Sequence, residues 1–295
     1  MAKNILLTGA TGFIGSHVLQ SLVQKDYNVI ALIRPTSNTW RIDCLQDKFR
    51  SIIVPFSAMD FEPIFTQHNI DTIIHTATDY GRVSPISDIL LSNVLFPVRL
   101  MEAGLKNGLK RFINTDSFFG KNSQTSSYLK QYIHSKKILL DILKEEKGFL
   151  RIDNLRLEHP FGEHDADGKF VSMLINEMKQ KKEKIALTEG SQKRDFIYVK
   201  DVANAFVKVL EQDDNAIGFN EFEVGTGHSI SVKEFVQTLA AVLQSGASLA
   251  FGDLPARSDD ITDSKADTTM LNALGWYPLY DLKTALQHTV AAYGK

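Results

Sequence analysis

The first half of the chain alternates between short apolar segments and amphipathic segments, and this rhythm limits the folds that it can form. Six segments rich in β-branched residues read as strands: 4–7, 28–33, 51–56, 71–77, 111–115 and 150–157. Several are apolar almost throughout, as strands covered on both faces must be. The stretches between them predict helices near 13–25, 60–69, 85–107 and 124–147. Such alternation favours a parallel sheet with crossover helices, a doubly wound α/β domain.

The second half loses this rhythm after about residue 160, which indicates a smaller lobe. Helices are predicted near 169–182, 200–211 and 231–244, and residues 246–264 read as irregular. The third helix opens on Ser231-Val-Lys-Glu234, a capping box in which the serine accepts a hydrogen bond from a first-turn N–H. No Pro- or Ser-rich linker separates the halves. We therefore expect a domain over residues 1–160 and a lobe over residues 161–295, from which some segments return to the first domain.

Charge and cysteine content argue against several classes of partner. The 295-residue chain has a formal net charge of −2, which gives no electrostatic basis for binding nucleic acid or an anionic membrane. Cys44 is its one cysteine, so no disulfide can form within the chain, as suits a reducing cytoplasm. No stretch reaches the roughly 18 apolar residues of a membrane helix, and the first residues lack a signal-peptide pattern. We expect a cytoplasmic protein.

A glycine-rich turn lies between the first predicted strand and the first predicted helix. The sequence LLTGATGFIGSH spaces Gly9, Gly12 and Gly15 three residues apart, a pattern typical of a dinucleotide-binding loop in this context. Gly9 would permit the tight turn, Gly12 would let the backbone approach a pyrophosphate, and Gly15 would let helix and strand pack closely. The helix N-terminus then offers free N–H groups to phosphate. The alternative is a glycine turn with a structural role alone.

The end of the second strand indicates which dinucleotide is bound. NAD-binding domains often carry an acidic residue there, which accepts hydrogen bonds from the ribose hydroxyls. Here the sequence reads ALIRPTSN, with Ile33 at the acidic position and Arg34 after it. Because a guanidinium suits a 2′-phosphate, we expect NADP(H) in preference to NAD(H). An Arg34 that faces solvent beside an indifferent site is the alternative.

A tyrosine and a lysine lie one helical turn apart in QYIHSK, residues 131–136. On a helix, Tyr132 and Lys136 would share a face. An ammonium beside a phenol favours the phenolate and makes the tyrosine a usable acid at neutral pH. Chance also produces such pairs on helix surfaces, so the pair gains weight only with a cofactor and a third catalytic group.

Together these motifs resemble the extended short-chain dehydrogenase/reductases of the NAD-dependent epimerase/dehydratase family, over nearly the whole chain. TGATGFIG is similar to the family's cofactor loop, DTIIHTAT to the strand under the cofactor and YIHSK to its Y-x-x-x-K pair. The resemblance implies a Rossmann-type NADP-binding domain, a small C-terminal substrate-binding lobe, and a homodimer formed through helices 85–107 and 124–147. The cofactor-binding residues that it implies are Gly9, Thr11, Gly12, Phe13, Ile14, Gly15, Arg34, Ala77, Thr78, Tyr132 and Lys136.

The segment NTDSFFG at the fifth strand bears on the family's third catalytic group. It resembles the TDEVYG run of sugar-nucleotide 4,6-dehydratases, which places the catalytic hydroxyl at Thr115 and the dehydratase acid at Asp116. Ser117 stands where a dehydratase carries its glutamate base. Without that carboxylate, removal of a proton next to a ketone has no expected base. The resemblance thus implies Thr115, Tyr132 and Lys136 as catalytic residues and disfavours dehydration.

The resemblance also implies a set of substrate-binding residues. LRLEHPFG puts His159 where the family often has an asparagine that contacts substrate, and the runs KRDF and ARSDD supply two arginines for the diphosphate, Arg194 and Arg257. Asp116 and Ser117 complete the set. A buried structural histidine and a structural ion pair are the alternatives for His159 and Arg194. Nothing completes a set of metal ligands, so no metal is expected.

Within the family, NTDSFF, LRLEH and TEGSQKRDF resemble the branch that reduces CDP-linked 4-keto-3,6-dideoxyhexoses. We therefore expect an enzyme that reduces the 4-keto group of a nucleotide-linked deoxysugar with NADPH, in deoxysugar and lipopolysaccharide O-antigen biosynthesis. Thr115 would hydrogen-bond the carbonyl oxygen, and Tyr132 would donate the proton as hydride arrives. The alternatives are a nucleotide-sugar 4-epimerase with tightly bound NAD and a non-catalytic NADP-binding regulator.

Overall fold

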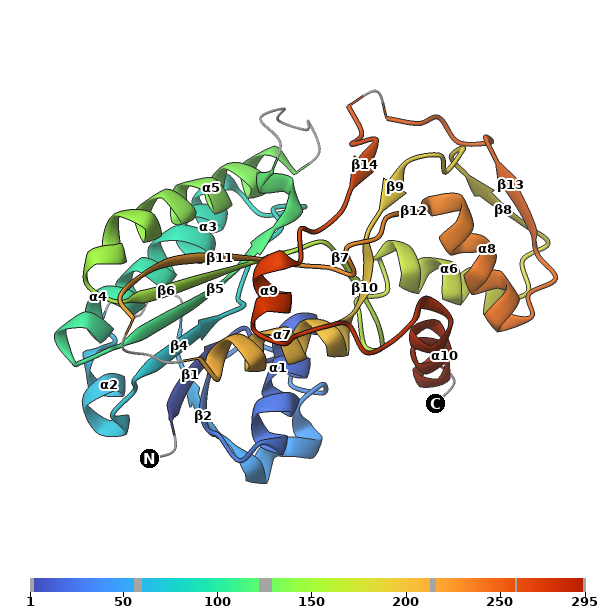
Figure 1. Cartoon of the computed structure of the whole chain (residues 1–295). Coiled ribbons are helices and arrows are strands. Elements are labelled where there is room, and N and C mark those ends of the chain that lie inside the picture. The colour runs from blue at the N-terminus through green and yellow to red at the C-terminus, as the bar shows by residue number, and fades with distance from the viewer. Residues whose placement is uncertain (1–2, 56–59, 122–128, 213–215, 258, 294–295) are drawn as a thin grey trace. The chain divides into compact units, whose positions relative to one another are not determined.

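The chain divides into two units, each of which is described by itself (Figure 1). The first comprises residues 1–156 and 203–222, and the second comprises residues 157–202 and 223–295. Within them, the computed structural model describes residues 3–55, 60–121, 129–212, 216–257 and 259–293.

A seven-stranded sheet forms the centre of the first unit, in the order β11-β6-β5-β4-β1-β2-β3. β1 pairs in parallel with β2 and β4, β2 with β3, and β4 with β5. The predicted Rossmann-type doubly wound sheet is confirmed, with strand ends shifted by at most a few residues. The strands are β1 (Asn4–Thr8), β2 (Asn28–Ile33), β3 (Arg50–Ile53), β4 (Thr72–His75), β5 (Arg111–Ser117), β6 (Arg151–Leu157) and β11 (Gly218–Val224).

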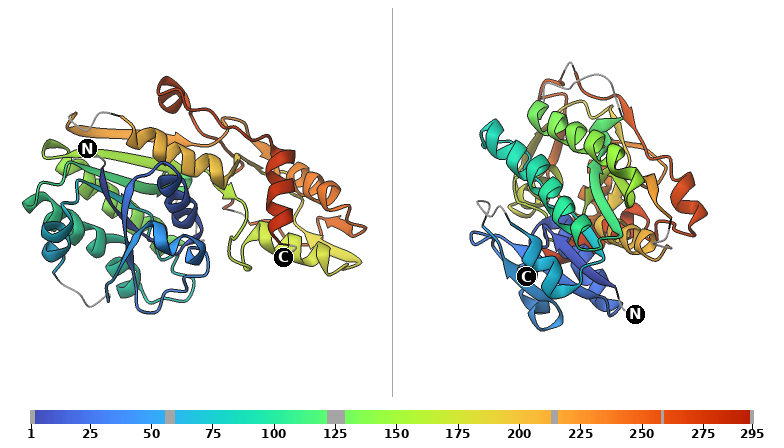
Figure 2. Two further views of the ribbon diagram at one scale, coloured as in Figure 1. Left: turned by 90° about the horizontal axis from the view of Figure 1, so that it is seen from below. Right: turned by 90° about the vertical axis from the view of Figure 1, so that its left-hand side faces the viewer.

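Helices cover both faces of this sheet (Figures 1 and 2). α1 and α7 lie side by side on one face, where Lys25 and Glu211 form an ion pair at 2.6 Å, and α4 and α5 lie on the other. The apolar side chains of Leu6, Ile73 and Phe112 pack under the second group of helices and form a continuous core. The helices are α1 (Phe13–Gln24), η1 (Asp43–Lys48), α2 (Glu62–His68), α3 (Ile86–Leu90), α4 (Phe96–Lys106), η3 (Phe118–Gly120), α5 (Lys130–Glu145), η4 (Glu146–Gly148) and α7 (Val199–Leu210).

The helix predicted over 85–107 is interrupted by a π-helical turn, η2 (Leu91–Leu95), between α3 and α4. Pro97 explains the interruption, because it has no N–H to give to the carbonyl of Asn93 four residues earlier. Single π turns inside helices are frequent at functional sites. For the helix predicted over 124–147, residues 124–128 lie outside the described residues, and α5 covers the remainder.

A buried arginine joins the sheet to the end of α7. Arg111 is fully buried on β5 and donates from Nε to Asp153 on β6 at 2.6 Å. Its Nη atoms donate to the carbonyls of Val209 at 2.6 Å and Leu210 at 3.1 Å. These carbonyls are among the last four of the helix, which have no partner within it, so Arg111 caps α7 and complements the negative end of its dipole.

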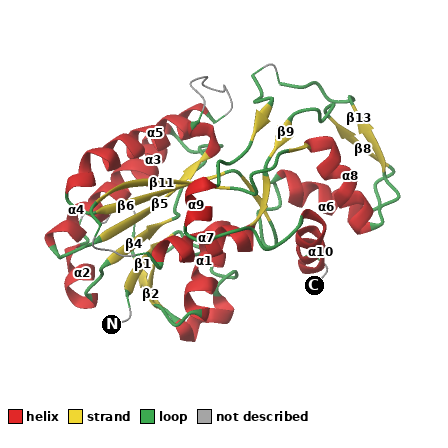
Figure 3. Ribbon diagram, in the orientation of Figure 1, coloured by secondary structure: helices red, strands yellow, loops and turns green. Residues whose placement is uncertain are grey.

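The second unit combines small sheets with helices (Figure 3). β7 pairs with β10, β9 lies between β12 and β14, and β8 pairs with β13. The serine half of the predicted capping box is confirmed, since the Ser231 hydroxyl accepts from Glu234 N–H at 3.0 Å at the start of α8. The elements are β7 (His159–Phe161), α6 (Phe170–Lys179), β8 (Lys184–Leu187), β9 (Lys193–Arg194), β10 (Phe196–Tyr198), β12 (Ile230–Ser231), α8 (Val232–Leu243), β13 (Ser248–Phe251), β14 (Asp263–Ser264), α9 (Thr269–Ala273) and α10 (Leu282–Ala292).

The interpretation of residues 246–264 as irregular is wrong in part. β13 pairs in parallel with β8 over four residues, and β14 adds two residues beside β9. At four and two residues, these strands are too short for periodicity to identify them, and their partners lie far away in sequence. Among the residues that the structure describes, no helix is long and apolar enough to cross a membrane.

Candidate active site

The glycine loop forms a tight turn that only glycine can make. Gly9 has a φ of +74°, and a Cβ atom there would lie 2.5 Å from the backbone nitrogen of Ala77. A Cβ atom on Gly15 would overlap the carbonyl oxygen of Gly9, and Gly12 N–H donates to that oxygen at 2.9 Å. The loop therefore brings β1, β4 and the start of α1 into direct backbone contact.

The start of α1 has the features of a phosphate-binding site. Its N-cap is Gly12, which supplies no side-chain hydrogen bond, so the first N–H groups remain available for an external acceptor. Phe13 and Ile14 form the first turn, and Thr11 precedes it in the loop. Because the loop leaves no room for side chains and offers backbone donors, the residues present fit a dinucleotide.

Two arginines follow β2 in the chain, Arg34 directly after it and Arg41 further on, and Arg41 contacts the glycine loop. Ile33 is buried and Arg34 is exposed, which fits both an arginine that meets a cofactor phosphate and the alternative of an arginine that faces solvent. Sequence reasoning missed Arg41, whose Nη1 donates to the carbonyl of Thr11 at 3.2 Å and whose guanidinium stacks 4.5 Å from the Trp40 ring centre. No local sequence pattern identifies Arg41, because its partner Thr11 lies 30 residues earlier, with α1 and β2 between them.

α5 directs Tyr132 and Lys136 into the sheet, where both side chains are buried. Lys136 Nζ donates to the main-chain carbonyl of Thr115 at 2.8 Å. The phenol of Tyr132 hydrogen-bonds with the side chain of Ser117, and its ring stacks on Tyr80 with centres 4.9 Å apart. The structure thus brings helix α5 and the end of β5 together at one site.

A small pocket lies at this junction. Its lining includes Asp116, Ser117, Phe119, Gly120, Tyr132 and Lys136. The pocket therefore gathers the tyrosine, the lysine and one hydroxyl of the fifth strand at a single surface that a small polar group can reach.

The side chain that meets Tyr132 is Ser117, whereas the family resemblance implies Thr115 for this position. Both residues belong to β5, and residues two apart on a strand point to the same face. The hydroxyl of Thr115 is buried and has no hydrogen-bond partner within the described residues. Either hydroxyl can thus donate to an oxygen placed at this face, and Ser117 is the one in contact with Tyr132.

Burial is the main cause of the pKa shifts at this site. Burial, followed by the neighbouring phenol of Tyr80, raises the pKa of Tyr132 well above its ordinary value, while the hydrogen bond with Ser117 opposes that shift. Burial lowers the pKa of Lys136 to about 8, although Asp116 raises it. The expected acidification of Tyr132 by Lys136 is absent from this arrangement, because the lysine is directed to the Thr115 carbonyl.

Asp116 lines this pocket and also belongs to a buried polar network. Its Oδ2 accepts from Arg156 Nε at 3.1 Å and from Asn154 Nδ2 at 3.3 Å. Arg156 in turn donates both Nη groups to Glu221, at 2.7 and 2.8 Å. This paired arrangement meets the requirement that a buried carboxylate be compensated, so Asp116 lines the pocket with its orientation fixed.

Asn93 connects the loop after β4 to helix α5. Its Nδ2 donates to the carbonyl of Asp79 at 2.8 Å and to Ser135 Oγ at 2.9 Å, and its Oδ1 accepts from Asp79 N–H at 2.7 Å. Thr78 Oγ1 donates to the same oxygen at 3.3 Å. Asn93 therefore fixes the segment that holds Ala77 and Thr78, the cofactor contacts expected after β4.

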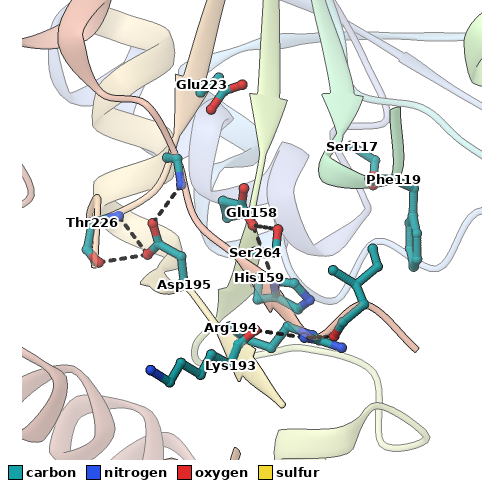
Figure 4. A network of polar contacts seen from close by, with 12 residues as sticks. Ser117, Phe119, Glu158, His159, Lys193, Arg194, Asp195, Glu223, Thr226 and Ser264 are labelled. Atoms are coloured by element: carbon teal, nitrogen blue, oxygen red, sulfur yellow. Dashed lines mark hydrogen bonds and ion pairs between the residues drawn. The ribbon is translucent and has the colours of Figure 1, made fainter. Parts of the chain in front are cut away.

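The second unit holds the remaining predicted residues (Figure 4). Arg194 donates to Asp260 at 2.6 Å and to the carbonyl of Ile261 at 2.5 Å, so its guanidinium lies in an ion pair. Arg257 is exposed in the loop that precedes this partner. His159 is half-buried, with Nδ1 3.6 Å from the carboxylate of Glu158.

Comparison with known proteins now adds to this geometry. The family model of the NAD dependent epimerase/dehydratase family matches residues 5–225. The chain belongs to that family. It is 40% identical over 290 residues to CDP-abequose synthase of Salmonella muenchen, with 97% of this chain and 96% of the relative covered. It is 32% identical to CDP-abequose synthase of Salmonella typhimurium strain LT2, with 97% of each covered.

Solved structures of the epimerase/dehydratase family share the fold. A UDP-glucuronic acid 4-epimerase variant from Bacillus cereus, solved with a UDP-sugar and NAD, has a TM-score of 0.85 and 25% identity, with 98% of both chains covered. The prediction of an enzyme from a NAD-dependent oxidoreductase family is thus confirmed, and these relatives are named for nucleotide-sugar chemistry. Within the described residues, no group of three or more His, Cys, Asp and Glu side chains could hold a metal ion.

Proposed function

We propose that the protein reduces the 4-keto group of a nucleotide-linked deoxysugar, a CDP-4-keto-3,6-dideoxyhexose, with NADPH as the cofactor. The observation that carries the proposal is the pocket at the end of β5. There Tyr132, Ser117 and Lys136 meet, and a hydroxyl occupies the position at which a dehydratase would need a carboxylate base. The similarity to two CDP-abequose synthases over nearly the whole chain supports the same chemistry.

Tyr132 is the proton donor in this proposal. NADPH, when bound, supplies the hydride that reduces carbon 4. The oxygen of the reduced carbon is an alkoxide, and its conjugate acid is an alcohol, which is a far weaker acid than an ordinary phenol. A phenol whose pKa is raised by burial is still a stronger acid than that alcohol, so proton transfer from Tyr132 remains favourable.

The other residues orient the ketone and stabilise charge. Thr115 and Ser117 present hydroxyls on one face of β5 that can donate to the carbonyl oxygen, and Ser117 also supports the phenolate that forms on Tyr132. Lys136 would bind the nicotinamide ribose once a cofactor competes for its contact with the Thr115 carbonyl. Asp116, fixed by Arg156, supplies a negative charge that favours the ammonium form of Lys136.

Arginines carry the proposed recognition of phosphate. Arg34 would meet the 2′-phosphate of NADP(H), with Arg41 beside the same loop. Arg194 and Arg257 would bind the substrate diphosphate, for which Arg194 must share or leave its ion pair with Asp260. The family resemblance implies a homodimer formed through helices 85–107 and 124–147, which correspond to α3, η2 and α4 and to α5. Leu95 on η2 and Ile138 on α5 are exposed apolar side chains that such an interface would cover.

The second candidate is a nucleotide-sugar 4-epimerase, which the similarity to an epimerase structure with NAD supports. One assay separates the two: oxidation of NADPH in the presence of CDP-, dTDP-, UDP- and GDP-linked 4-ketosugars. We expect stoichiometric oxidation with the CDP-linked ketosugar. NAD that stays bound through purification, together with interconversion of 4-hydroxy sugars without net oxidation, would contradict the reductase.

A further inference from the structure

Glu158 is a buried carboxylate at the base of the half-buried His159 ring (Figure 4). Glu158 is 2% exposed, and its Oε2 accepts a hydrogen bond from Ser264 Oγ at 2.7 Å. The same oxygen lies 3.6 Å from His159 Nδ1. Burying a carboxylate costs solvation free energy, and only hydrogen bonds and charged partners offset that cost. A buried Glu158 next to the His159 ring therefore points to a role for this contact.

The surroundings of the ring hold it in one orientation. The main-chain N–H of His159 donates to the carbonyl of Asp195 at 3.1 Å, and the ring packs against Phe196 with centres 6.0 Å apart. Because Nδ1 and Nε2 lie on opposite sides of an imidazole, the contact of Nδ1 with Glu158 directs Nε2 away from the carboxylate. His159 also follows the carboxyl end of β6, the edge of a parallel sheet at which ligands bind.

We propose that Glu158 is a positioning residue that keeps the proton of neutral His159 on Nδ1, so that Nε2 accepts a hydrogen bond from a hydroxyl of the sugar nucleotide. The inference rests on the proposed function for its ligand class and goes beyond it in assigning Glu158. A carboxylate accepts hydrogen bonds only, so it favours the proton on the nitrogen that faces it. The 3.6 Å between Glu158 Oε2 and His159 Nδ1 is longer than a formed hydrogen bond, so the preference acts here through the negative charge of the carboxylate. The second nitrogen is then an acceptor, which suits a sugar or ribose hydroxyl and does not suit a phosphate oxygen.

The charged groups around the ring favour the neutral form. Burial, the largest influence, lowers the pKa of His159, and the positive charge of Arg194 lowers it as well. Glu158 and Asp195 are the negative groups that raise it. When the ring takes a second proton in acid, Nε2 becomes a donor and can no longer accept the hydrogen bond from the substrate hydroxyl. Substrate affinity therefore falls as the pH falls through the pKa of His159.

The test measures the tautomer and the affinity separately. The tautomer of His159 is read from two-bond ¹⁵N–¹H correlation spectra of the labelled protein, with the signal assigned by its loss in His159→Asn. We expect the Nδ1–H tautomer in the natural protein. In Glu158→Gln an amide N–H₂ can donate to Nδ1, so we expect the Nε2–H tautomer to appear. The Nε2–H tautomer in the natural protein, or an unchanged spectrum in Glu158→Gln, would overturn the proposal.

Affinity is measured as the dissociation constant of CDP-glucose by calorimetry between pH 5 and 9, and as KM in the ketosugar assay. We expect Glu158→Gln to weaken binding about tenfold, the loss that one hydrogen bond gives, and Glu158→Asp to recover part of it. Glu223→Gln is the matched control, since Glu223 accepts from the backbone of Asp267 outside this contact and should leave binding unchanged. Equal effects of both glutamine variants would overturn the proposal.

A failure of the proposed function and a failure of the Glu158 assignment give different results. If the natural protein oxidises NADPH with none of the four ketosugars, the proposed function fails, yet the spectra and the CDP-glucose titration still decide the role of Glu158. If reduction proceeds but the Glu158→Gln variant keeps the natural tautomer and affinity, the assignment of Glu158 fails and the reductase stands.

Discussion

Lys136 donates a hydrogen bond from its ammonium group to the main-chain carbonyl of Thr115, which lies 2.8 Å away and 21 residues earlier in the chain. This contact joins α5 to the end of β5 and fixes the distance between the helix and the strand. It also sets the direction of the lysine side chain. In the proposed reaction the Lys136 ammonium donates a hydrogen bond to a ribose hydroxyl of the cofactor. The charge of the lysine and the groups around it therefore affect the reaction.

Tyr132→Phe should abolish reduction and leave the fold intact. The ring of Tyr132 stacks on Tyr80, and phenylalanine preserves that packing while it removes the proton donor. General acid catalysis contributes roughly 10²–10⁴-fold, so kcat should fall by that factor. NADPH binding, measured by quenching of tryptophan fluorescence, should remain. Turnover at the natural rate would refute the role of Tyr132.

Ser117→Ala and Thr115→Val distinguish which hydroxyl supports proton donation by Tyr132. The hydrogen bond from Ser117 lowers the pKa of Tyr132, so its loss should raise that pKa further and reduce kcat by about tenfold. Thr115→Val should instead raise KM if its hydroxyl only binds the ketone. The two variants are compared by kcat and KM across pH. Indistinguishable profiles would show that the two hydroxyls are interchangeable.

Local signals were enough to predict the sheet, the glycine turn and the pair on α5, because each depends on periodicity or on a short spacing. They could not identify Ser117 as the contact of Tyr132, since Thr115 and Ser117 share a face of β5 and only the position of the helix decides between them. The pairing of Asp116 with Arg156 likewise depends on which strand lies beside β5. The sequence carries no local mark of such tertiary contacts.

Lys136 should make stability depend on pH in the alkaline range. Its pKa is about 8 in the folded protein, against the ordinary lysine value of 10.5, so between these values the unfolded chain holds a proton that the folded chain lacks. The free energy of unfolding therefore rises with pH from about 8 to about 10.5, by on the order of 3 kcal/mol for this group alone. Lys136→Met should lack that rise. Urea titrations of both proteins at pH 7, 9 and 10 test the difference.

Arg111→Met should destabilise the first unit without touching the pocket. Arg111 is fully buried, pairs with Asp153 and caps the carbonyl end of α7. Its loss leaves the carbonyls of Val209 and Leu210 without their donor, which costs about 1–3 kcal/mol for a buried acceptor. Asp153 keeps its ion pair with Arg151 at 3.0 Å, so its charge stays compensated. Arg50→Met, at an exposed position of β3, is the control and should change the unfolding free energy little. Equal unfolding midpoints in urea for the two variants would contradict the capping role.

Arg34→Ala should change which cofactor is preferred. An exposed guanidinium at the end of β2 can bind the 2′-phosphate of NADPH but has no equivalent partner on NADH. The dissociation constant for NADPH should rise about tenfold, in the range of a lost charged hydrogen bond, while that for NADH stays the same. Arg41→Ala, tested beside it, shows whether the arginine that contacts Thr11 shares the phosphate. If the natural protein binds NADH as tightly as NADPH, neither arginine selects the cofactor, because a 2′-phosphate that contributed to binding would separate the two.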